Sequence, residues 1–202
     1  PNLGYLAYAE LIPELKQFGK PVIASIAGLC EDDFLTMARV INQANPDLIE
    51  VNLSCPNIPG KPQIAYDPVD SERLLKRVRP LIKVPMGVKL PPYFDPAHQA
   101  VMAEVIGRCG VDYLNLINSV GNGLVIDPKR ETPVIKPKGG FGGLGGSLIK
   151  PVALANVRAF WKLLAGRIPI IGTGGVVQGI DAFEHVLCGA SAVQVGTVLV
   201  EE

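Results

Sequence analysis

The sequence has few of the residues that build metal sites and disulfide frameworks. Its 202 residues include only two histidines and one tryptophan, and its four cysteines form no CxxC pair. The cysteines are Cys30, Cys55, Cys109 and Cys188. No metal site is therefore expected, and we interpret the cysteines as reduced thiols of a cytoplasmic protein.

The sequence also lacks an excess of charge and a long apolar run. Nineteen basic residues (Lys and Arg) balance 19 acidic ones (Asp and Glu), so the formal net charge at pH 7 is zero. Neither nucleic acid nor an acidic membrane surface is therefore predicted as a partner. No apolar stretch is long enough to cross a bilayer, and none resembles a signal peptide. A hydrophobic content of 48% supports one sizeable core, and we expect a single domain over residues 1–202.

Short apolar runs alternate with amphipathic segments along the chain. Six runs are predicted as buried strands, beginning near residues 21, 48, 85, 111, 168 and 192. Helices are predicted at about 5–18, 32–44, 71–82, 96–108, 151–165 and 180–187. Pro13 is expected to kink or divide the first helix, and Asp70 or Ser71 to cap the third. The Gly-, Lys- and Pro-rich stretch 120–150 is predicted as an excursion, in which 124–126 and 133–136 could form a hairpin.

The alternation of strands and helices predicts parallel βα units. Six strands fit either an open doubly wound sheet or an incomplete (β/α)8 TIM barrel, because the closed barrel has eight. Polar residues at the carboxyl ends of the strands favour the barrel, in which all these ends meet at one rim. These residues are Asn52, Cys55, Lys89, Asn118, Ser119, Gly174 and Thr197.

The strand at 48–53 leads into a loop with one cysteine among polar residues. Cys55 follows Asn52 and Ser54 and precedes Asn57. Amides recognise flat polar molecules because each offers donors and an acceptor, and a thiolate can act as nucleophile or proton acceptor. The alternative is a buried structural cysteine in a proline-rich turn.

Two strand ends rich in glycine, IGTGG at 171–175 and VGT at 195–197, predict a phosphate site. Barrels often hold phosphate on the loops after their last two strands, where glycine lets backbone N–H groups approach the anion. The alternative is a pair of tight turns. The G-x-G-x-x-G match at 140–145 is not a dinucleotide fingerprint, because no acidic residue stands between Glu131 and Asp181. The basic residues of that interval favour an anionic ligand or form a solvated surface.

Lys89 stands in an otherwise apolar strand, GVKL. A lysine is rarely buried without a partner. Lys89 could donate to the anionic ring edge of a cofactor, which we favour, or pair with a structural carboxylate. His98 and His185 lie on predicted helices, and we interpret both as structural.

Five segments closely resemble the dihydroorotate dehydrogenase family. They are NLSCPNIPGKPQIAYD (52–67), GVKLPPYFD (87–95), INSVGNGLVIDP (117–128), GGLGGSLIKPVALANVRAF (142–160) and IGTGGVVQGIDAFEHVLCGA (171–190). PGKPQ after the cysteine resembles the fumarate-dependent class 1A rather than the NAD-linked class 1B. A cysteine rather than a serine at this position separates the chain from the membrane-associated class 2.

The resemblance implies a cytoplasmic, homodimeric flavoprotein of de novo pyrimidine biosynthesis. Such an oxidoreductase uses FMN to oxidise (S)-dihydroorotate to orotate and is reoxidised by fumarate. By resemblance, Cys55 is the general base, and Asn52, Asn57, Asn118 and Ser119 contact orotate. The residues expected to contact FMN are Asn52, Lys89, Ile117, Gly146, Gly174, Gly175, Gly196 and Thr197, with Lys89 at the N1/O2 edge of the ring. No metal is implied.

Family members extend beyond both ends of this sequence. The resemblance therefore implies that two strands and a terminal helix lie outside residues 1–202, and that this chain alone binds FMN poorly. Two other functions stay open from the residues. One is an FMN oxidoreductase similar to the pyrimidine-reducing domain of dihydropyrimidine dehydrogenase, and the other is a flavin-free phosphate-binding barrel, either an isomerase or a binding protein.

Overall fold

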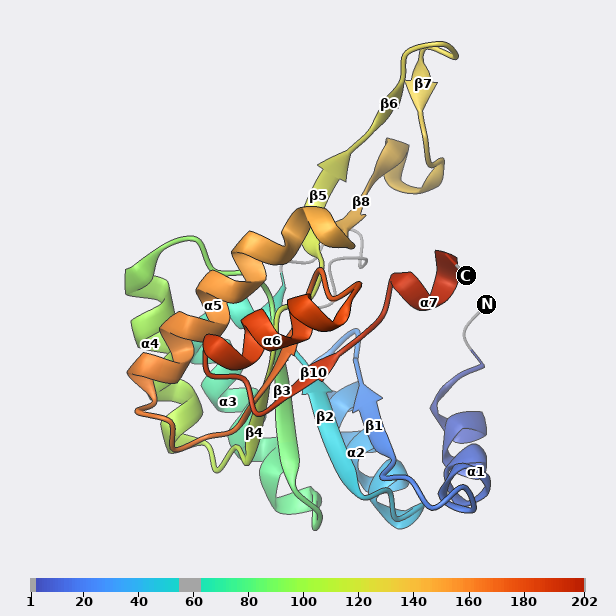
Figure 1. The fold of residues 1–202 in the computed structure, drawn as a ribbon. Helices are drawn as coiled ribbons and strands as arrows, with labels where there is room; N and C mark the ends of the chain where they lie inside the picture. Colours follow the sequence, from blue (N-terminus) through green and yellow to red (C-terminus); the bar gives the residue numbers. More distant parts are fainter. Residues whose placement is uncertain (1–2, 55–62, 202) are drawn as a thin grey trace.

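A computed structural model describes residues 3–54 and 63–201 of the chain. Six strands form its main sheet (Figure 1): β1 Ile23–Ile26, β2 Leu48–Asn52, β3 Met86–Leu90, β4 Tyr113–Leu116, β9 Ile170–Thr173 and β10 Ala192–Gln194. Their order across the sheet is β1-β2-β3-β4-β9-β10, and each neighbouring pair is parallel.

The strand order identifies the architecture. A doubly wound sheet reverses direction at a switch point, whereas here each strand pairs with the next main-sheet strand along the chain. The sheet is therefore an incomplete (β/α)8 barrel, and the six-strand prediction is confirmed. β1 and β10 are its edges and do not pair with each other in the described chain.

Helices between successive strands pack on the outer face of the curled sheet (Figure 1). They are α2 Glu31–Gln43, α3 Pro68–Val78, α4 Pro96–Arg108, α5 Lys150–Leu163 and α6 Gly179–Leu187. α1 Tyr5–Lys16 precedes β1 and packs against α2, and the short α7 Val198–Glu201 follows β10. None of the helices in the described ranges is long and apolar enough to span a bilayer.

α1 is a single helix that includes Pro13, so of the two expected effects of this proline, division of the helix does not occur. The predicted N-cap of the third helix is wrong. α3 begins at Pro68, and its cap is Asp67, whose carboxylate accepts from the backbone N–H groups of Val69 and Asp70. Proline is well suited to the first helical position, because an N–H group there would have no acceptor within the helix. Asp67-Pro68 therefore starts the helix before Asp70.

Alternation along each strand separates a helix-facing side from an inner side. In β2, Ile49 and Val51 are fully buried in the core, while Glu50 between them lies on the inner side. The same holds for Lys89 between Val88 and Leu90 in β3. The core thus lies between sheet and helices, and the inner face of the sheet carries polar side chains.

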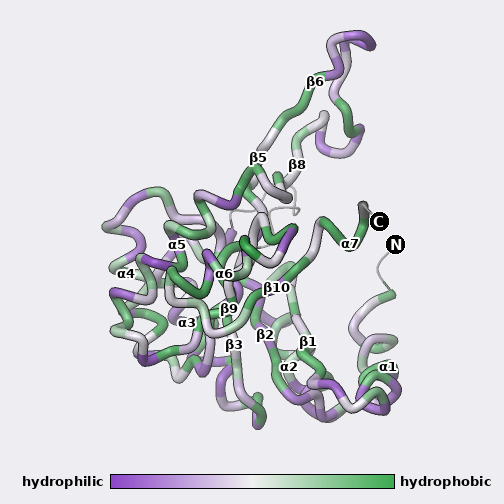
Figure 2. The backbone as a smooth tube through the Cα atoms, in the orientation of Figure 1, coloured by the Kyte–Doolittle hydropathy of each residue, from purple (hydrophilic) through white to green (hydrophobic). Residues whose placement is uncertain are grey.

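The excursion at 120–150 forms an arm that projects from the barrel (Figure 1). β5 Val120–Leu124 pairs antiparallel with β8 Phe141–Leu144, and β6 Ile126–Asp127 pairs with β7 Thr132–Pro133. The predicted hairpin is confirmed by the pairing of Ile126 with Pro133 and by the hydrogen bond from Val134 N–H to Val125 O at 2.9 Å. Its tip is hydrophilic (Figure 2). The match at 140–145 largely coincides with β8, an antiparallel strand and not the strand-to-helix turn of a dinucleotide site.

Candidate active site

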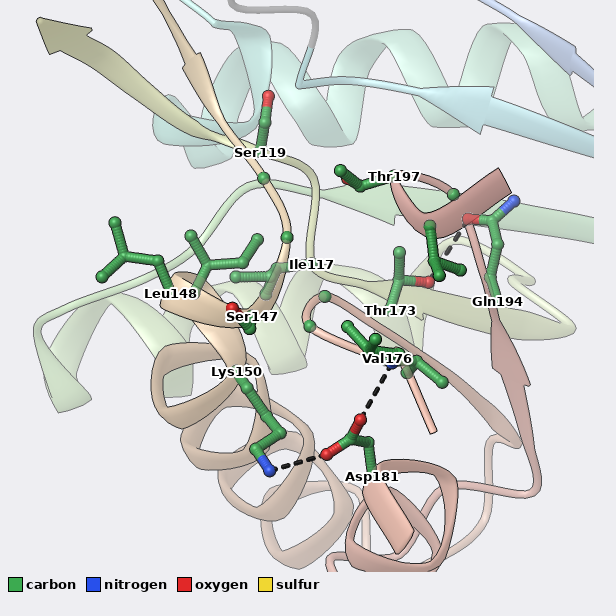
Figure 3. Close-up of a pocket in the computed structure, with 18 of the residues that line it drawn as sticks. Ile117, Ser119, Ser147, Leu148, Lys150, Thr173, Val176, Asp181, Gln194 and Thr197 are labelled. Carbon is green, nitrogen blue, oxygen red and sulfur yellow. Dashed lines mark hydrogen bonds and ion pairs between the residues drawn. The ribbon is translucent and has the colours of Figure 1, made fainter. Parts of the chain in front are cut away.

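A cavity of about 560 Å³ opens at the carboxyl ends of β4, β9 and β10 and at the start of α5 (Figure 3). This volume is within the usual range for a small-molecule site. Most of the predicted site residues line it, although they come from distant parts of the chain. They are Lys89, Ile117, Asn118, Ser119, Gly146, Gly174, Gly175, Gly196 and Thr197.

Glycines let three chain segments approach one another at this rim. A Cβ on Gly175 would lie 2.4 Å from the Cβ of Lys150 and 3.0 Å from its backbone nitrogen. Gly175 also has a φ of 72°, in the left-handed region that side chains other than glycine rarely adopt. On the other side, a Cβ on Gly145 would lie 3.0 Å from Thr197 Oγ1. The segments 145–147, 173–175 and 196–197 thus form a close cradle beside the N-terminus of α5, which suits a phosphate group.

An ion cluster fixes the cradle from below. Lys150 Nζ lies 2.8 Å from Asp181 Oδ1 (Figure 3) and 2.7 Å from Glu184 Oε2. The other oxygen of Asp181 accepts from the backbone N–H groups of Val177 and Gln178. The Lys150 hydrogen bond, followed by these two, lowers the pKa of Asp181 to about 2. The positive charge of Lys150 is therefore balanced by these two carboxylates, and Lys150 adds little to the positive potential at the cavity.

Lys89 has a different environment from Lys150. Its Nζ donates to Gln194 Oε1 at 2.9 Å, and it forms no ion pair with a described carboxylate. Burial lowers the pKa of Lys89, and the negative charge of Glu50 opposes that shift. Of the two interpretations from sequence, direct pairing with a carboxylate is not what the structure shows, and the cofactor contact stays a prediction.

Asn52 and Asn118 interlock through Ser54. Asn118 Nδ2 lies 3.2 Å from Asn52 Oδ1, 3.0 Å from Ser54 O and 3.0 Å from Ser54 Oγ. Ser54 Oγ also lies 3.1 Å from Asn52 Oδ1, and Ser54 is fully buried. These contacts join the ends of β2 and β4. The predicted residues Cys55 and Asn57 lie outside the described residues, so their placement is not part of this geometry.

Two residues of the site were missed as functional candidates. Ser54 is the hub between the two asparagines, and Gln194 holds Lys89. A signal for Gln194 does exist, because a long polar side chain in the apolar strand AVQV parallels Lys89 in GVKL. Ser54 gave no signal beyond its place beside Cys55.

His185 supports the glycine turn from beneath, as its structural interpretation requires. Its Nε2 lies 3.1 Å from Gly174 O, and because a carbonyl only accepts, Nε2 carries the proton. Its Nδ1 is buried without a hydrogen-bond partner among the described residues. A Cβ on Gly172 would lie 2.4 Å from this atom. Protonation of Nδ1 would place a buried charge there, so the neutral ring is favoured.

We predict that His185 makes stability fall on acidification below about pH 6.5, the ordinary histidine pKa. Burial lowers the pKa of His185 in the folded protein. Between that lowered value and the unfolded one, the unfolded chain binds more protons, so stability is lost as the pH falls through this window. Thermal unfolding at pH 8 and pH 5.5 should show a smaller drop in Tm for His185→Gln than for wild type. His98→Gln, at an exposed position, is the control and should leave the drop unchanged. An equal drop in all three proteins would contradict the prediction.

The fold and the cavity define a TIM-barrel protein with a cavity of small-molecule size at the carboxyl rim of its strands. A sequence model of the dihydroorotate dehydrogenase family matches residues 1–202. The chain therefore belongs to the dihydroorotate dehydrogenase family.

Curated relatives agree with this family. The chain is 51% identical to "Dihydroorotate dehydrogenase A (fumarate)" of Lactococcus lactis subsp. cremoris, covering 100% of this chain and 66% of the relative. It is 54% identical to "Dihydroorotate dehydrogenase (fumarate)" of Kluyveromyces lactis, covering 100% and 65%. The chain thus spans slightly less than two-thirds of the length of these relatives.

A solved structure supports the fold. The crystal structure of DHODH in complex with ferulenol from Eimeria tenella superposes with a TM-score of 0.71 at 22% identity. The superposition covers 86% of this chain and 50% of the other one. At this level of identity the likeness is evidence for the architecture alone.

Proposed function

We propose that this chain is the larger part of a class 1A dihydroorotate dehydrogenase that oxidises (S)-dihydroorotate to orotate and passes the electrons to fumarate. The observation that carries the proposal is the common cavity. Residues assigned to substrate and cofactor from five separate stretches of sequence, from Lys89 to Thr197, line it. The two curated relatives described above carry "(fumarate)" in their names, which supports the choice of acceptor.

FMN is the proposed cofactor, and the residues present fit it. Gly145 and Gly175 let the segments 145–147, 173–175 and 196–197 lie close together at the cavity, where backbone N–H groups can approach a phosphate. Lys89 and Ile117 line the same cavity and suit the ring. When bound, FMN supplies a hydride acceptor for C6 of the substrate. Residues 1–202 then belong to a single FMN-binding TIM-barrel domain, of which they are a fragment.

The side chains of the chain itself position the substrate and move its proton. Asn52, Asn57, Asn118 and Ser119 offer donors and acceptors to the edges of a flat pyrimidine. Cys55 Sγ, as thiolate, takes the proton from C5 of dihydroorotate. Lys89 places a positive charge at the edge of the ring where negative charge develops on reduction. We further propose a cytoplasmic homodimer.

Spectroscopy of the full-length protein tests this function. We expect a yellow protein whose visible flavin band bleaches when dihydroorotate is added without oxygen and returns when fumarate is added. A protein without a visible band would support the flavin-free phosphate-binding barrel. NADPH-linked uracil reduction without fumarate reduction would support the enzyme similar to dihydropyrimidine dehydrogenase.

A further inference from the structure

A buried carboxylate lies on the inner face of the sheet, and the proposed reaction does not use it. Glu50 in β2 is only 3% exposed. Its Oε1 accepts from Ser25 Oγ at 2.8 Å, and its Oε2 accepts from Asn115 Nδ2 at 2.7 Å. Both donors are neutral. A buried charge without a bonded cation is expensive, so its retention calls for an explanation.

Asn115 connects this carboxylate to the cavity. Its Nδ2 also donates to Gln194 Oε1 at 2.9 Å, so the two amide hydrogens serve Glu50 and Gln194 respectively. The hydroxyl of Thr173 donates to Asn115 Oδ1, and Asn115 is only 1% exposed. With every polar atom of the amide bonded, Glu50 and Thr173 fix the orientation of Asn115.

Gln194 connects Asn115 to Lys89 by hydrogen bonds. Its Oε1 accepts from Asn115 Nδ2 and from Lys89 Nζ, both at 2.9 Å. Thr173 Oγ1, whose hydrogen goes to Asn115, lies 3.3 Å from the same oxygen (Figure 3). The amide oxygen therefore points toward the cavity, and the ammonium is bonded to it. A continuous chain of hydrogen bonds runs from Glu50 through Asn115 and Gln194 to Lys89, across four strands of the sheet.

Glu50 and Lys89, at the two ends of this series of hydrogen bonds, also interact through their charges. Burial lowers the pKa of Lys89, and the negative charge of Glu50 raises it again. The other titratable side chain near Glu50 on this face is Tyr113 on β4. Its pKa is raised above the ordinary value, by burial first and by Glu50 second, so its phenol stays neutral. Within the described residues, Glu50 is thus the charge that counters desolvation of the ammonium.

We propose that Glu50 is a positioning residue for Lys89, which fixes the ammonium in the cavity through Asn115 and Gln194 and keeps it charged. The inference rests on the proposed function, in which Lys89 lies against the flavin ring. Glu50 itself touches neither substrate nor cofactor in this scheme. It sets where the positive charge lies and over which pH range it is present.

Glu50→Gln in the full-length protein tests this role, because glutamine keeps the shape and removes the charge. The apparent pKa of Lys89 is measured by competitive labelling with acetic anhydride and mass spectrometry. We expect it to fall by about one unit, as for the loss of a nearby opposite charge. Where flavin is bound, the alkaline break in its midpoint potential against pH should move down by the same amount. Glu72→Gln is the matched control, since Glu72 pairs with Lys76 and Arg108 on the exposed side of α3.

The possible outcomes separate this inference from the proposed function. An unchanged Lys89 pKa in folded Glu50→Gln overturns the positioning role, even if the protein is an active flavoenzyme. Wild type without flavin overturns the proposed function, while the labelling still decides the role of Glu50. If Glu50→Gln does not fold, Gln194→Met decides, because methionine has a similar length and volume and removes only the polar amide. This variant removes the hydrogen-bond acceptor of Lys89. An unchanged pKa of Lys89 in Gln194→Met would therefore contradict the proposal that Glu50 acts on Lys89 through Asn115 and Gln194.

Discussion

Replacing Cys55 by alanine is expected to lower turnover of dihydroorotate by about 10²–10⁴-fold, the usual loss when a general base is removed. Alanine cannot accept the C5 proton, but it leaves the phosphate cradle unchanged, so FMN should remain bound. The measurement is kcat with fumarate as acceptor, beside the flavin content of the purified variant. In wild type the rate should rise with pH, because an ordinary thiol with a pKa of about 8.5 is mostly protonated at neutral pH.

Cys30→Ser provides the control for this experiment. Cys30 is exposed and precedes α2 as its N-cap, a position that serine also suits. This variant should turn over as wild type does. A Cys55→Ala enzyme with a near wild-type rate would remove Cys55 from the mechanism and would favour its interpretation as a structural cysteine.

Gly175→Ala is expected to weaken FMN binding by about 30-fold or more. The new Cβ would lie 2.4 Å from the Cβ of Lys150 at a φ of 72°. Backbone strain and overpacking together cost about 2 kcal/mol or more, which is about a 30-fold loss if the cradle must distort to relieve them. Flavin dissociation followed by fluorescence gives the affinity directly.

The neighbouring Gly179 supplies a matched control for this substitution. A Cβ at Gly179 meets nothing within 4 Å, and its backbone is helical at the start of α6. Gly179→Ala should therefore leave FMN affinity and Tm almost unchanged. Equal affinities in the two variants would contradict the assignment of the cradle to the phosphate.

The architecture follows from the sequence because the apolar runs of the four central strands are buried on their helix side, whereas the edge strands β1 and β10 are more exposed. All six main strands lie where the runs predict them, within a few residues. The small sheet of β5 and β8 was missed, since VGNGL and FGGL contain too much glycine to indicate strands. Its pairing depends on contact between two segments of the arm, which local propensity does not encode.

The rim residues were predictable for a similar reason, as the carboxyl ends of parallel strands converge. The inner hydrogen-bond chain was not. Lys89 and Gln194 are 105 residues apart, and Glu50 and Asn115 are 65 apart. No spacing rule connects such positions. The available signal was weaker, a polar residue at alternate places in LIEVN, YLNL and AVQ.

That alternation also determines how neighbouring strands align. Strands of a parallel sheet are usually apolar on both sides, and their register is then specified weakly by side chains. Here Asn52 lies opposite Lys89, and Lys89 lies opposite Asn115. A slip of one residue would turn a charged or amide side chain toward the helices, among fully buried aliphatic groups. The polar lining of the barrel therefore disfavours any pairing that is shifted by one residue, and so helps to specify the register of the strands.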